Sequence, residues 1–391
     1  MTNTDTNKPL VIVGTGLGGY NLAKEFRKID SNTPLVMITQ DDGHFYSKPQ
    51  LSTALGFGKT PSQLVITDVN VMKTQLNANI LTHATVIAIS PEQQTIQVQW
   101  QNKLHEIEYK DLVLALGATP KPFSILDNYQ HHYRINNLHE YASFVDNLDN
   151  LQSLTIIGSG LVGSEFAHDF IQKGKQVNIV TIDPYPLYNL VPEALGHDLQ
   201  KALEKLGVVF YTKTHIQSVN ADLGIINLML SSNQQISTTG VLTAIGLNPN
   251  LAIAKKAGIE THQGIIVDSM LKTSIDNIYA LGDCVEINGI CRQYVAPILQ
   301  SARALAQTLA GKPTNVHFPV TPISLKVSSY PLIICPPNAN GTWQCEHHPD
   351  GIKALFHDEN EVLQGYALSG SQVEHRQSCL NLLHKAPAAI A

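Results

Sequence analysis

Two glycine-rich turns, one near the start of the chain and one near its middle, limit most strongly what this sequence can fold into. The first follows a short apolar run at residues 10–13 and reads Gly14-Thr15-Gly16-Leu17-Gly18-Gly19. A helical pattern at residues 20–28 and a second apolar run at residues 34–39 come after it. Short apolar runs bounded by glycine favour buried strands, and the longer periodic segment favours a helix. The order predicts a strand, a glycine turn, a helix and a strand.

The same order recurs 144 residues later, counted from Gly14 to Gly158. An apolar run at residues 154–157 leads into a helix that extends to Ile171 and a strand at residues 177–182, and the turn between them reads Gly158-Ser159-Gly160-Leu161-Val162-Gly163. This spacing gives each copy a domain of its own. We therefore predict an α/β fold with two nested Rossmann-like domains.

Glycine has a chemical reason to occupy these turns. A turn between a strand and a helix brings backbone N–H groups and the positive end of the helix toward a pyrophosphate, and a side chain there would block its approach. One such string is weak evidence, whereas two in the same strand-to-helix context are strong evidence. The sequence thus predicts two dinucleotide sites, and two glycine-rich turns in an unrelated α/β protein are the alternative.

The remaining pattern divides the chain further. We expect strands at residues 80–89, 95–100, 106–109, 112–116, 208–211, 240–245 and 278–281, a polar hairpin up to residue 232, and a helix at residues 296–309. Residues 317–391 carry strand patterns at 332–335, 353–357 and 362–369 and a last helix at 372–384, which predicts a small α+β third domain. The first dinucleotide domain is predicted to comprise residues 1–111 and 240–316, and the second residues 112–239.

Charge and hydropathy exclude several classes of function. The net charge is −6 at pH 7, and the basic residues are spread thinly, so no field gathers the phosphates of a nucleic acid. The first apolar run ends after four residues, unlike a signal peptide, and no stretch approaches the roughly 18 apolar residues of a membrane span. We expect no nucleic-acid partner, no membrane insertion and a cytoplasmic location.

The cysteines and histidines do not form an obvious metal or redox site. The five cysteines show no C-x-x-C spacing, and are Cys284, Cys291, Cys335, Cys345 and Cys379. We expect them to be reduced thiols buried as small apolar side chains, and we expect no zinc or iron–sulfur site. His347 and His348 lie in a polar segment without further ligands at useful spacing, which predicts a solvated loop.

The ends of the second strands bear on which dinucleotide binds. The first fold should offer a group to the adenosine ribose about 20 residues beyond its turn, and Thr39, Gln40 and Asp41 stand there. The second fold reaches Thr181, with Asp183 beyond, and no Arg or Lys occurs from Thr181 to Asp198. A 2′-phosphate would need such a cation, so we infer NADH over NADPH.

Three further landmarks resemble those of the flavoprotein reductases with two dinucleotide domains. They lie at residues 112–120, with Gly117, at residues 244–250, with Gly246, and at residues 273–283, ending in Gly282-Asp283. The resemblance covers about residues 10–310. It implies that the first domain binds FAD and the second binds NAD(H), and that Asp283 holds the ribityl or pyrophosphate region of FAD.

A more specific resemblance identifies a branch of this family. The segment around Tyr46-Ser47-Lys48-Pro49, residues 302–311 and the short third domain resemble the rubredoxin-reducing enzymes of bacterial alkane oxidation. The resemblance implies NADH:rubredoxin oxidoreductase activity that feeds an alkane hydroxylase, with the small acidic iron protein rubredoxin as partner. Ferredoxin reductases carry Arg where Lys48 stands and often Lys where Thr53 stands, which argues against a ferredoxin reductase.

The resemblance also implies roles for individual residues. Lys48 would lie against the flavin and stabilise the charge of its reduced form, unless it is merely an exposed loop lysine. Glu165 would meet the nicotinamide or the flavin edge, or would only interact with the helix dipole. Docking of an acidic carrier requires a local basic patch, with Lys326 and Arg303 as possible members. Further predicted cofactor contacts are Pro49, Val86, Ala115, Val295 and Lys326.

Other activities remain open on the sequence alone. An NADH oxidase or peroxidase shares the scaffold, but its peroxidase members need a cysteine near the flavin, and the first cysteine here is Cys284. A ferredoxin reductase of an oxygenase system is a second alternative. A non-catalytic NADH-sensing flavoprotein is the third, from a different class of function.

Overall fold

The computed structural model describes residues 8–337 and 339–385 of the chain. The chain folds into two compact units. The first unit comprises Met1–Lys48, Ser62–Thr119 and Leu247–Phe318, and the second comprises Pro49–Pro61, Pro120–Gly246 and Pro319–Ala391. Each unit is therefore built from segments that are far apart in the sequence.

The core of the first unit is a five-stranded parallel sheet in the order β21-β9-β1-β2-β5. Its strands are β1 (Leu10–Val13), β2 (Leu35–Ile38), β5 (Ala78–Leu81), β9 (Asp111–Leu114) and β21 (Ile278–Ala280). All four residues of β1 are buried, as expected of a strand covered on both faces. With β1 at the centre and the chain order reversing beside it, this is the strand order of a Rossmann fold.

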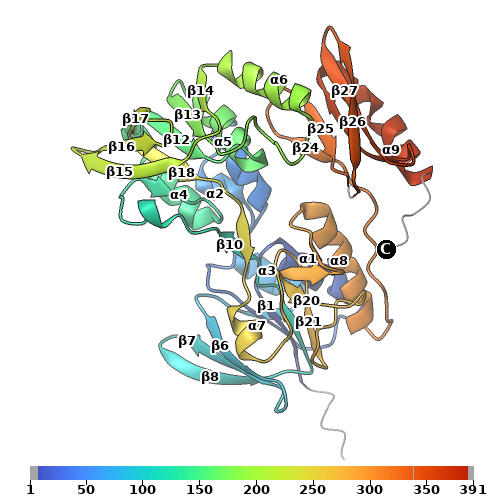
Figure 1. Cartoon of the computed structure of the whole chain (residues 1–391). Helices are drawn as coiled ribbons and strands as arrows, with labels where there is room; N and C mark the ends of the chain where they lie inside the picture. The colour runs from blue at the N-terminus through green and yellow to red at the C-terminus, as the bar shows by residue number, and fades with distance from the viewer. Residues whose placement is uncertain (1–7, 338, 386–391) are drawn as a thin grey trace, which may run out of the picture. The chain divides into compact units, whose positions relative to one another are not determined.

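Helices and smaller sheets complete the first unit. Helix α1 buries Tyr20, Leu22, Ala23 and Phe26 on one face and packs beside α8 (Figure 1). The helices are α1 (Leu17–Arg27), α3 (Val69–Leu76), α7 (Ala252–Lys256) and α8 (Val295–Leu309). The smaller sheets contain β3 (Phe45–Tyr46) with β4 (Val65–Thr67), β6 (Thr85–Ser90) with β7 (Thr95–Trp100) and β8 (Lys103–Glu108), and β20 (Ile265–Ile266) with β22 (Val285–Ile287) and β23 (Ile290–Cys291).

The second unit repeats this plan with a parallel sheet in the order β11-β18-β12-β13-β14. Its strands are β11 (His132–Tyr133), β12 (Ser153–Ile157), β13 (Gln176–Val180), β14 (Val208–Tyr211) and β18 (Gly240–Thr243). The helical segments are η3 (Ser124–Leu126), α4 (Leu138–Asp146), η4 (Leu148–Asn150), α5 (Leu161–Ile171) and α6 (Glu193–Glu204). An antiparallel sheet of β15 (Ile216–Asp222), β16 (Ile225–Leu230) and β17 (Gln235–Thr238) matches the β6-β7-β8 sheet of the first unit.

The second unit also contains two further parts. One part is residues 49–61, which contain most of the 3₁₀ segment η2 (Lys48–Thr53). Helix α2 (Pro61–Leu64) begins at the last of these residues, and its other residues belong to the first unit. The C-terminal part is an antiparallel sheet in the order β24-β25-β28-β27-β26, followed by η5 and α9. Its elements are β24 (Ile323–Leu325), β25 (Leu332–Cys335), β26 (Gly341–His348), β27 (Gly351–Asp358), β28 (Leu363–Ser369), η5 (Gly370–His375) and α9 (Arg376–Lys385). Short strands β10 (Ala118–Pro120) and β19 (Leu247–Pro249) form a pair, and all of their residues except Pro120 belong to the first unit.

The predicted domain boundaries are wrong at three places, two of them because of strand pairing. The third is residues 49–61, which were predicted in the first dinucleotide domain and belong to the second unit. Strand β9 pairs with β1, so residues 112–119 belong to the first unit and not to the second dinucleotide domain. Strand β18 pairs with β12, so residues 240–246 belong to the second unit. An apolar run does not reveal which sheet it joins, and both runs were therefore assigned to the wrong neighbour.

Four local predictions also need correction. The helix expected from residue 20 begins at Leu17, because the glycine turn itself forms the first helical turn. The strand expected at residues 80–89 is two strands, because His83 adopts φ 53° and ends the first. His347 and His348 do not lie in a loop, since β26 pairs with β27 as far as His348. The last helix starts at Arg376, because residues 370–375 first pack against β27 and β28 as a 3₁₀ segment.

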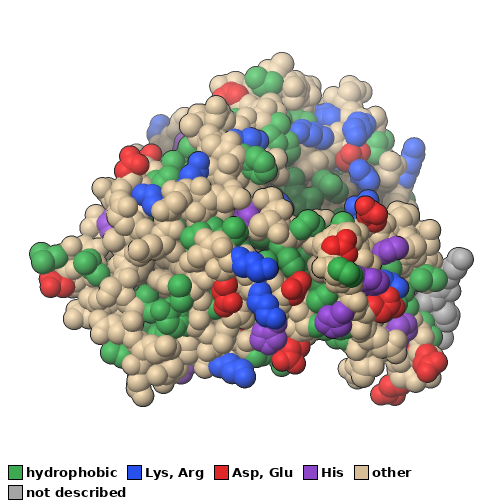
Figure 2. All heavy atoms as spheres, turned by 90° about the horizontal axis from the view of Figure 1, so that it is seen from above, with side chains coloured by type: hydrophobic (Ala, Val, Ile, Leu, Met, Phe, Trp, Pro, Cys, Tyr) green, Lys and Arg blue, Asp and Glu red, His purple; other side chains and the backbone are tan. Residues whose placement is uncertain are grey.

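Over most of the face drawn in Figure 2, charges of both signs are mixed, and several Lys and Arg side chains lie close together only at its upper right. Elsewhere on this face, Lys and Arg side chains are interspersed with Asp, Glu and His side chains. Among residues 8–337 and 339–385, no helix combines the length and the apolar character that a membrane crossing requires.

Candidate functional site: two dinucleotide turns and a buried carboxylate cluster

In the first glycine turn, two of the glycines are required by the fold itself. Gly14 adopts φ +114°, and a Cβ added there would overlap the backbone carbonyl oxygen of Ala115. A Cβ at Gly19 would overlap the carbonyl oxygen of Gly14, where helix α1 passes over strand β1. These positions bring strand and helix close together and would need glycine even without a ligand.

Gly16 differs, and so does its counterpart Gly160. Both have extended backbones, with φ of −68° and −71°, and an added Cβ would have no protein atom within 4 Å. They are the N-cap residues of α1 and α5, and because glycine has no side chain, the first N–H groups of both helices receive no capping hydrogen bond from them. Open space in front of uncapped helical N–H groups is the environment that a pyrophosphate occupies. The residues present therefore fit a dinucleotide in each unit.

At the end of β2, the predicted ribose-binding residues form a turn. Thr39 is buried and its hydroxyl accepts a hydrogen bond from the backbone N–H of Asp41 at 3.2 Å. Gln40 and Asp41 are exposed beyond it. Asp41 thus lies just beyond the end of β2, the strand that pairs with β1.

The matching edge of the second unit contains a cation that the sequence window did not include. The buried hydroxyl of Thr181 accepts from Ser159 at 3.0 Å and bonds the carboxylate of Asp183 at 3.3 Å. Lys213, in the loop after β14, donates its backbone N–H to the carbonyl oxygen of Asp183 at 3.1 Å. Because Lys213 lies 30 residues beyond Asp183, a search up to Asp198 could not find it.

Lys48 and Asp283 are brought close together in the first unit. Burial raises the pKa of the Asp283 carboxyl above its usual value, and the nearby charge of Lys48 acts in the opposite direction. Lys48 is only partly exposed and begins η2, so it is not simply a solvated loop lysine. The charge of the predicted FAD residue Lys48 therefore acts on the carboxyl of the predicted FAD residue Asp283.

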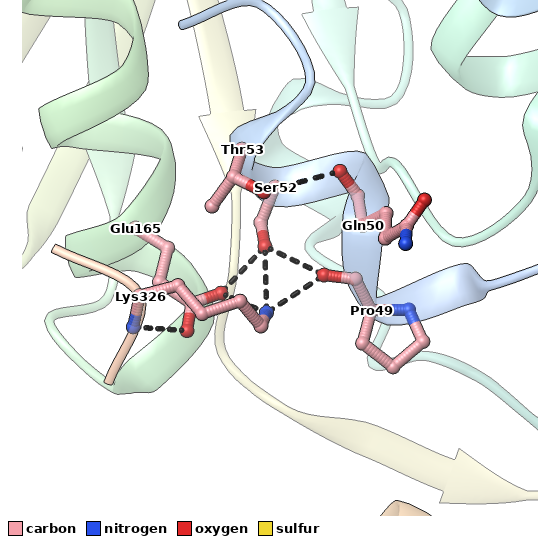
Figure 3. A network of polar contacts seen from close by, with 6 residues as sticks. All are labelled: Pro49, Gln50, Ser52, Thr53, Glu165 and Lys326. Atoms are coloured by element: carbon pink, nitrogen blue, oxygen red, sulfur yellow. Dashed lines mark hydrogen bonds and ion pairs between the residues drawn. The ribbon is translucent and has the colours of Figure 1, made fainter. Parts of the chain in front are cut away.

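Glu165 stands at the centre of a buried polar network in the second unit (Figure 3). Its Oε2 accepts from the Ser52 hydroxyl at 2.5 Å and pairs with Lys326 Nζ at 2.8 Å. Its Oε1 accepts from the backbone N–H of Lys326 at 3.1 Å. Lys326 Nζ also donates to the Pro49 carbonyl oxygen at 2.7 Å. The side chain of Glu165 is only 5 % exposed, so its charge is balanced by these donors.

One helical turn further along α5, Asp169 holds the next part of the same segment. Its Oδ2 accepts from the backbone N–H of Leu55 at 2.9 Å, and its Oδ1 accepts from that of Gly56 at 2.5 Å. Burial raises the pKa of Asp169 to about 6, while these two N–H groups oppose the shift. Glu165 and Asp169 therefore attach residues 49–56 to α5 at two points.

These contacts change the roles that we predicted for Glu165 and Lys326. An interaction with the helix dipole alone does not describe Glu165, which bonds to two other segments of the chain. Lys326 is not an independent member of a basic docking patch, because its ammonium pairs with Glu165. Arg303 is exposed on α8 of the first unit.

Sequence reasoning missed Ser52 and Asp169. Asp169 could have been noticed, because it follows Glu165 by four residues and so lies on the same face of α5. Ser52 could not, because 113 residues separate it from Glu165.

The other predicted cofactor residues divide between the two units. Those in the first unit besides the glycine turn are Val86, Ala115, Gly117, Gly282 and Val295, and those in the second are Pro49, Leu161, Val162, Gly163, Gly246 and Lys326. Val86 packs against the core, whereas Val295 is exposed at the start of α8. Gly117, Gly246 and Gly282 have φ of 65°, 99° and 88°, which other residues rarely adopt.

Comparison with known proteins gives the family directly. Residues 8–308 match the family model described as pyridine nucleotide-disulphide oxidoreductase. The chain belongs to this family. The recognition of a two-domain FAD- and NAD(H)-dependent oxidoreductase is thereby confirmed.

Individual relatives of this oxidoreductase extend over the whole chain. A rubredoxin-NAD(+) reductase of Acinetobacter baylyi is 38% identical over 382 residues, which covers 96% of this chain and 97% of that protein. A rubredoxin-NAD(+) reductase of Alcanivorax borkumensis is 39% identical over 372 residues, covering 94% and 96%. Among solved structures, a ferredoxin reductase from Rhodopseudomonas palustris has a TM-score of 0.88 at 21% identity, covering 97% and 96%, which shows a shared fold.

The C-terminal part of the oxidoreductase has its own match. Residues 315–383 match the model described as rubredoxin binding C-terminal domain. The disulphide in the family name has no counterpart near the glycine turns, because the first cysteine of the sequence is Cys284. All five cysteines are unpaired thiols, of which Cys284, Cys335 and Cys379 are buried as predicted and Cys291 and Cys345 are partly exposed.

Proposed function

We propose that this oxidoreductase is an FAD-dependent NADH:rubredoxin oxidoreductase. The observation that carries the proposal is the match of residues 315–383 to the rubredoxin-binding domain, on a chain whose full-length relatives are named rubredoxin-NAD(+) reductases. The match of residues 8–308 to the reductase family does not by itself identify the protein that accepts the electrons. The additional domain supports a rubredoxin as acceptor.

The cofactor defines the reaction, and the chain supplies its binding and electrostatics. When bound, FAD would accept a hydride from NADH and could release the two electrons one at a time to an iron protein. Gly16 and Gly160 leave space for the two pyrophosphates. Asp283 would hold the ribityl or pyrophosphate region of FAD, and Lys48 would place a positive charge where reduced flavin becomes negative. Hydride transfer itself needs no acidic or basic side chain of the protein to donate or accept a proton.

Glu165 and Lys326 would form a neutral pair in this scheme. The carboxylate and the ammonium cancel at 2.8 Å, so residues 49–52 are held without a net charge being added beside the nucleotide. The proposal that Glu165 meets the nicotinamide or the flavin rests on the family resemblance.

The setting of the reaction is also a proposal. We infer that the reduced rubredoxin feeds an alkane hydroxylase, as the resemblance of the sequence implies. A cytoplasmic location fits the five unpaired cysteines, because thiols stay reduced in that compartment.

The deciding experiment measures NADH consumption by the purified FAD-loaded protein with different acceptors. Rubredoxin, a plant-type ferredoxin, a vertebrate-type ferredoxin and oxygen alone are offered in parallel, and NADPH replaces NADH in a second series. We expect kcat/KM with rubredoxin to exceed the others by at least about tenfold, which corresponds to roughly 1.4 kcal/mol of transition-state stabilisation. Faster reduction of ferredoxin or oxygen would contradict the proposal while leaving the FAD and NAD(H) sites intact.

A further inference from the structure

A phenylalanine is presented to solvent on the segment that Glu165 and Asp169 attach to α5. Phe57 is 77 % exposed and is the most exposed aromatic side chain among the described residues. Glycine stands on both sides of it, at Gly56 and Gly58, and Lys59 follows. We call residues 54–59 the Phe57 turn. Scattered apolar side chains on a surface are common, so the exposure of Phe57 needs supporting observations.

The first such observation is that the Phe57 turn is held in one conformation. Gly58 donates its backbone N–H to the Leu55 carbonyl oxygen at 2.8 Å, and Lys59 donates to that of Ala54 at 2.9 Å. Gly58 has φ +64°, which suits glycine. The ring of Phe57 is therefore displayed by a turn closed at its base.

The second observation is that a buried charge fixes this turn. Asp169 is 3 % exposed, and its two carboxylate oxygens accept hydrogen bonds from the backbone N–H groups of Leu55 and Gly56. A side chain at Gly56 would overlap the Asp169 carboxylate. Because the turn is already fixed, it loses less conformational entropy when a partner protein binds to it.

The third observation links the Phe57 turn to the domain matched as rubredoxin-binding. Lys326 lies within residues 315–383 and donates to the Pro49 carbonyl oxygen at 2.7 Å and to the Ser52 hydroxyl at 3.4 Å. Ser328 of the same domain contacts His168 of α5 at 3.4 Å. The segment that carries Phe57 is thus continuous in structure with that domain, and both lie in the second unit.

We propose that the Phe57 turn is part of the docking surface for the acceptor protein, with the Phe57 ring as an apolar anchor and Lys59 as a cation that complements an acidic rubredoxin. Exposed aromatic side chains on rigid supports are frequent anchors of protein interfaces. Lys59 is exposed at the end of the Phe57 turn, and its charge would chiefly raise the rate at which rubredoxin associates with the reductase. This inference rests on the proposed function, because it takes rubredoxin as the acceptor.

The test compares Phe57→Ala with a matched control in the full-length FAD-loaded protein. Leu223→Ala is the control, because Leu223 is an apolar side chain of the second unit with 95 % exposure on another turn. We expect Phe57→Ala to raise the KM for rubredoxin about tenfold, as the loss of an interface anchor does. The rate with ferricyanide, which needs no protein docking, should stay within about twofold for both variants.

A second variant separates the anchor from the charge. Lys59→Glu should lower kcat/KM for rubredoxin most at low salt, and the difference from the unmodified protein should shrink as salt screens the charge. Binding of rubredoxin to the oxidised enzyme, measured by calorimetry, should weaken for Phe57→Ala and not for Leu223→Ala.

The outcomes are distinct. An unmodified protein that fails to reduce rubredoxin would overturn the proposed function itself. Rapid rubredoxin reduction with an unchanged KM in Phe57→Ala would overturn only the docking inference. A Phe57→Ala variant that changes self-association in sedimentation, with normal rubredoxin kinetics, would overturn it in favour of a second copy of this chain.

Discussion

At the residue scale, the two glycine turns contain positions with different physical demands. Gly14 and Gly19 are required by the close approach of strand and helix, whereas Gly16 faces open space. The sequence presents all three as one string and cannot separate them. The structure therefore assigns a packing role to Gly14 and Gly19 and leaves Gly16 as the position whose substitution tests ligand binding.

Exchange of Gly16 for Val should remove FAD and leave the protein folded. The new side chain would meet no protein atom, but it would occupy the space for the pyrophosphate. Gly19→Val should instead destabilise the fold, because its Cβ overlaps the Gly14 carbonyl. The measurement is flavin absorbance per protein together with far-UV circular dichroism. A folded Gly16→Val protein that keeps one FAD per chain would refute the assignment of the first site.

At the element scale, strands and glycine turns were largely predictable, and contacts between segments were not. Apolar runs bounded by glycine or proline located β1, β12 and β25 within one residue. The sheet that receives β9 or β18 depends on pairing across more than 80 residues, which no local pattern contains. The pairing of Glu165 with Lys326 spans 161 residues and was missed for the same reason.

Helix α5 gives a prediction about pH, since its buried Asp169 has a pKa raised to about 6. An aspartate in an unfolded chain titrates near pH 4, so the folded state binds more protons between about pH 4 and pH 6. The free energy of unfolding contributed by Asp169 must therefore fall as pH rises through this window, by at most about 1.4 kcal/mol per pH unit. Above about pH 6 the contribution levels off.

The Asp169→Asn variant isolates this effect. Compared with it, the unmodified protein should lose stability between about pH 4 and pH 6, as measured by urea unfolding at several pH values. The charge of Glu165 raises the pKa of Asp169, and the charge of Lys173 lowers it. Tyr141 and the neighbouring His168 also belong to the surroundings of Asp169. Asp276→Asn is the control, because Asp276 is exposed and its pKa is lowered by Lys272. Parallel curves for Asp169→Asn and the unmodified protein would contradict the assignment.

At the scale of the whole molecule, the two units share one plan, and we predict that each binds a dinucleotide of its own. Both units contain a five-stranded parallel sheet, and each sheet has a glycine turn after its central strand. Each unit has its own hydrophobic core. We therefore expect defects in one dinucleotide site to leave the other intact.

Gly160→Val tests this independence. The variant should retain FAD in full, because Gly160 belongs to the second unit. Its flavin should no longer be reduced by NADH at a measurable rate, whereas dithionite should still bleach it, as followed by stopped-flow absorbance. Loss of FAD from Gly160→Val, with the protein folded, would show that the two sites are coupled.

The interleaving of the two units has a consequence for synthesis on the ribosome. The first sheet receives its last strand, β21, only at Ala280, although it starts at Leu10. The second sheet begins and ends inside that interval and has all five strands by Thr243. The first sheet therefore cannot close until all five strands of the second parallel sheet have been translated, and α8, which packs on α1, emerges later still. Of the two parallel sheets, the one that starts first is thus the one that is completed last.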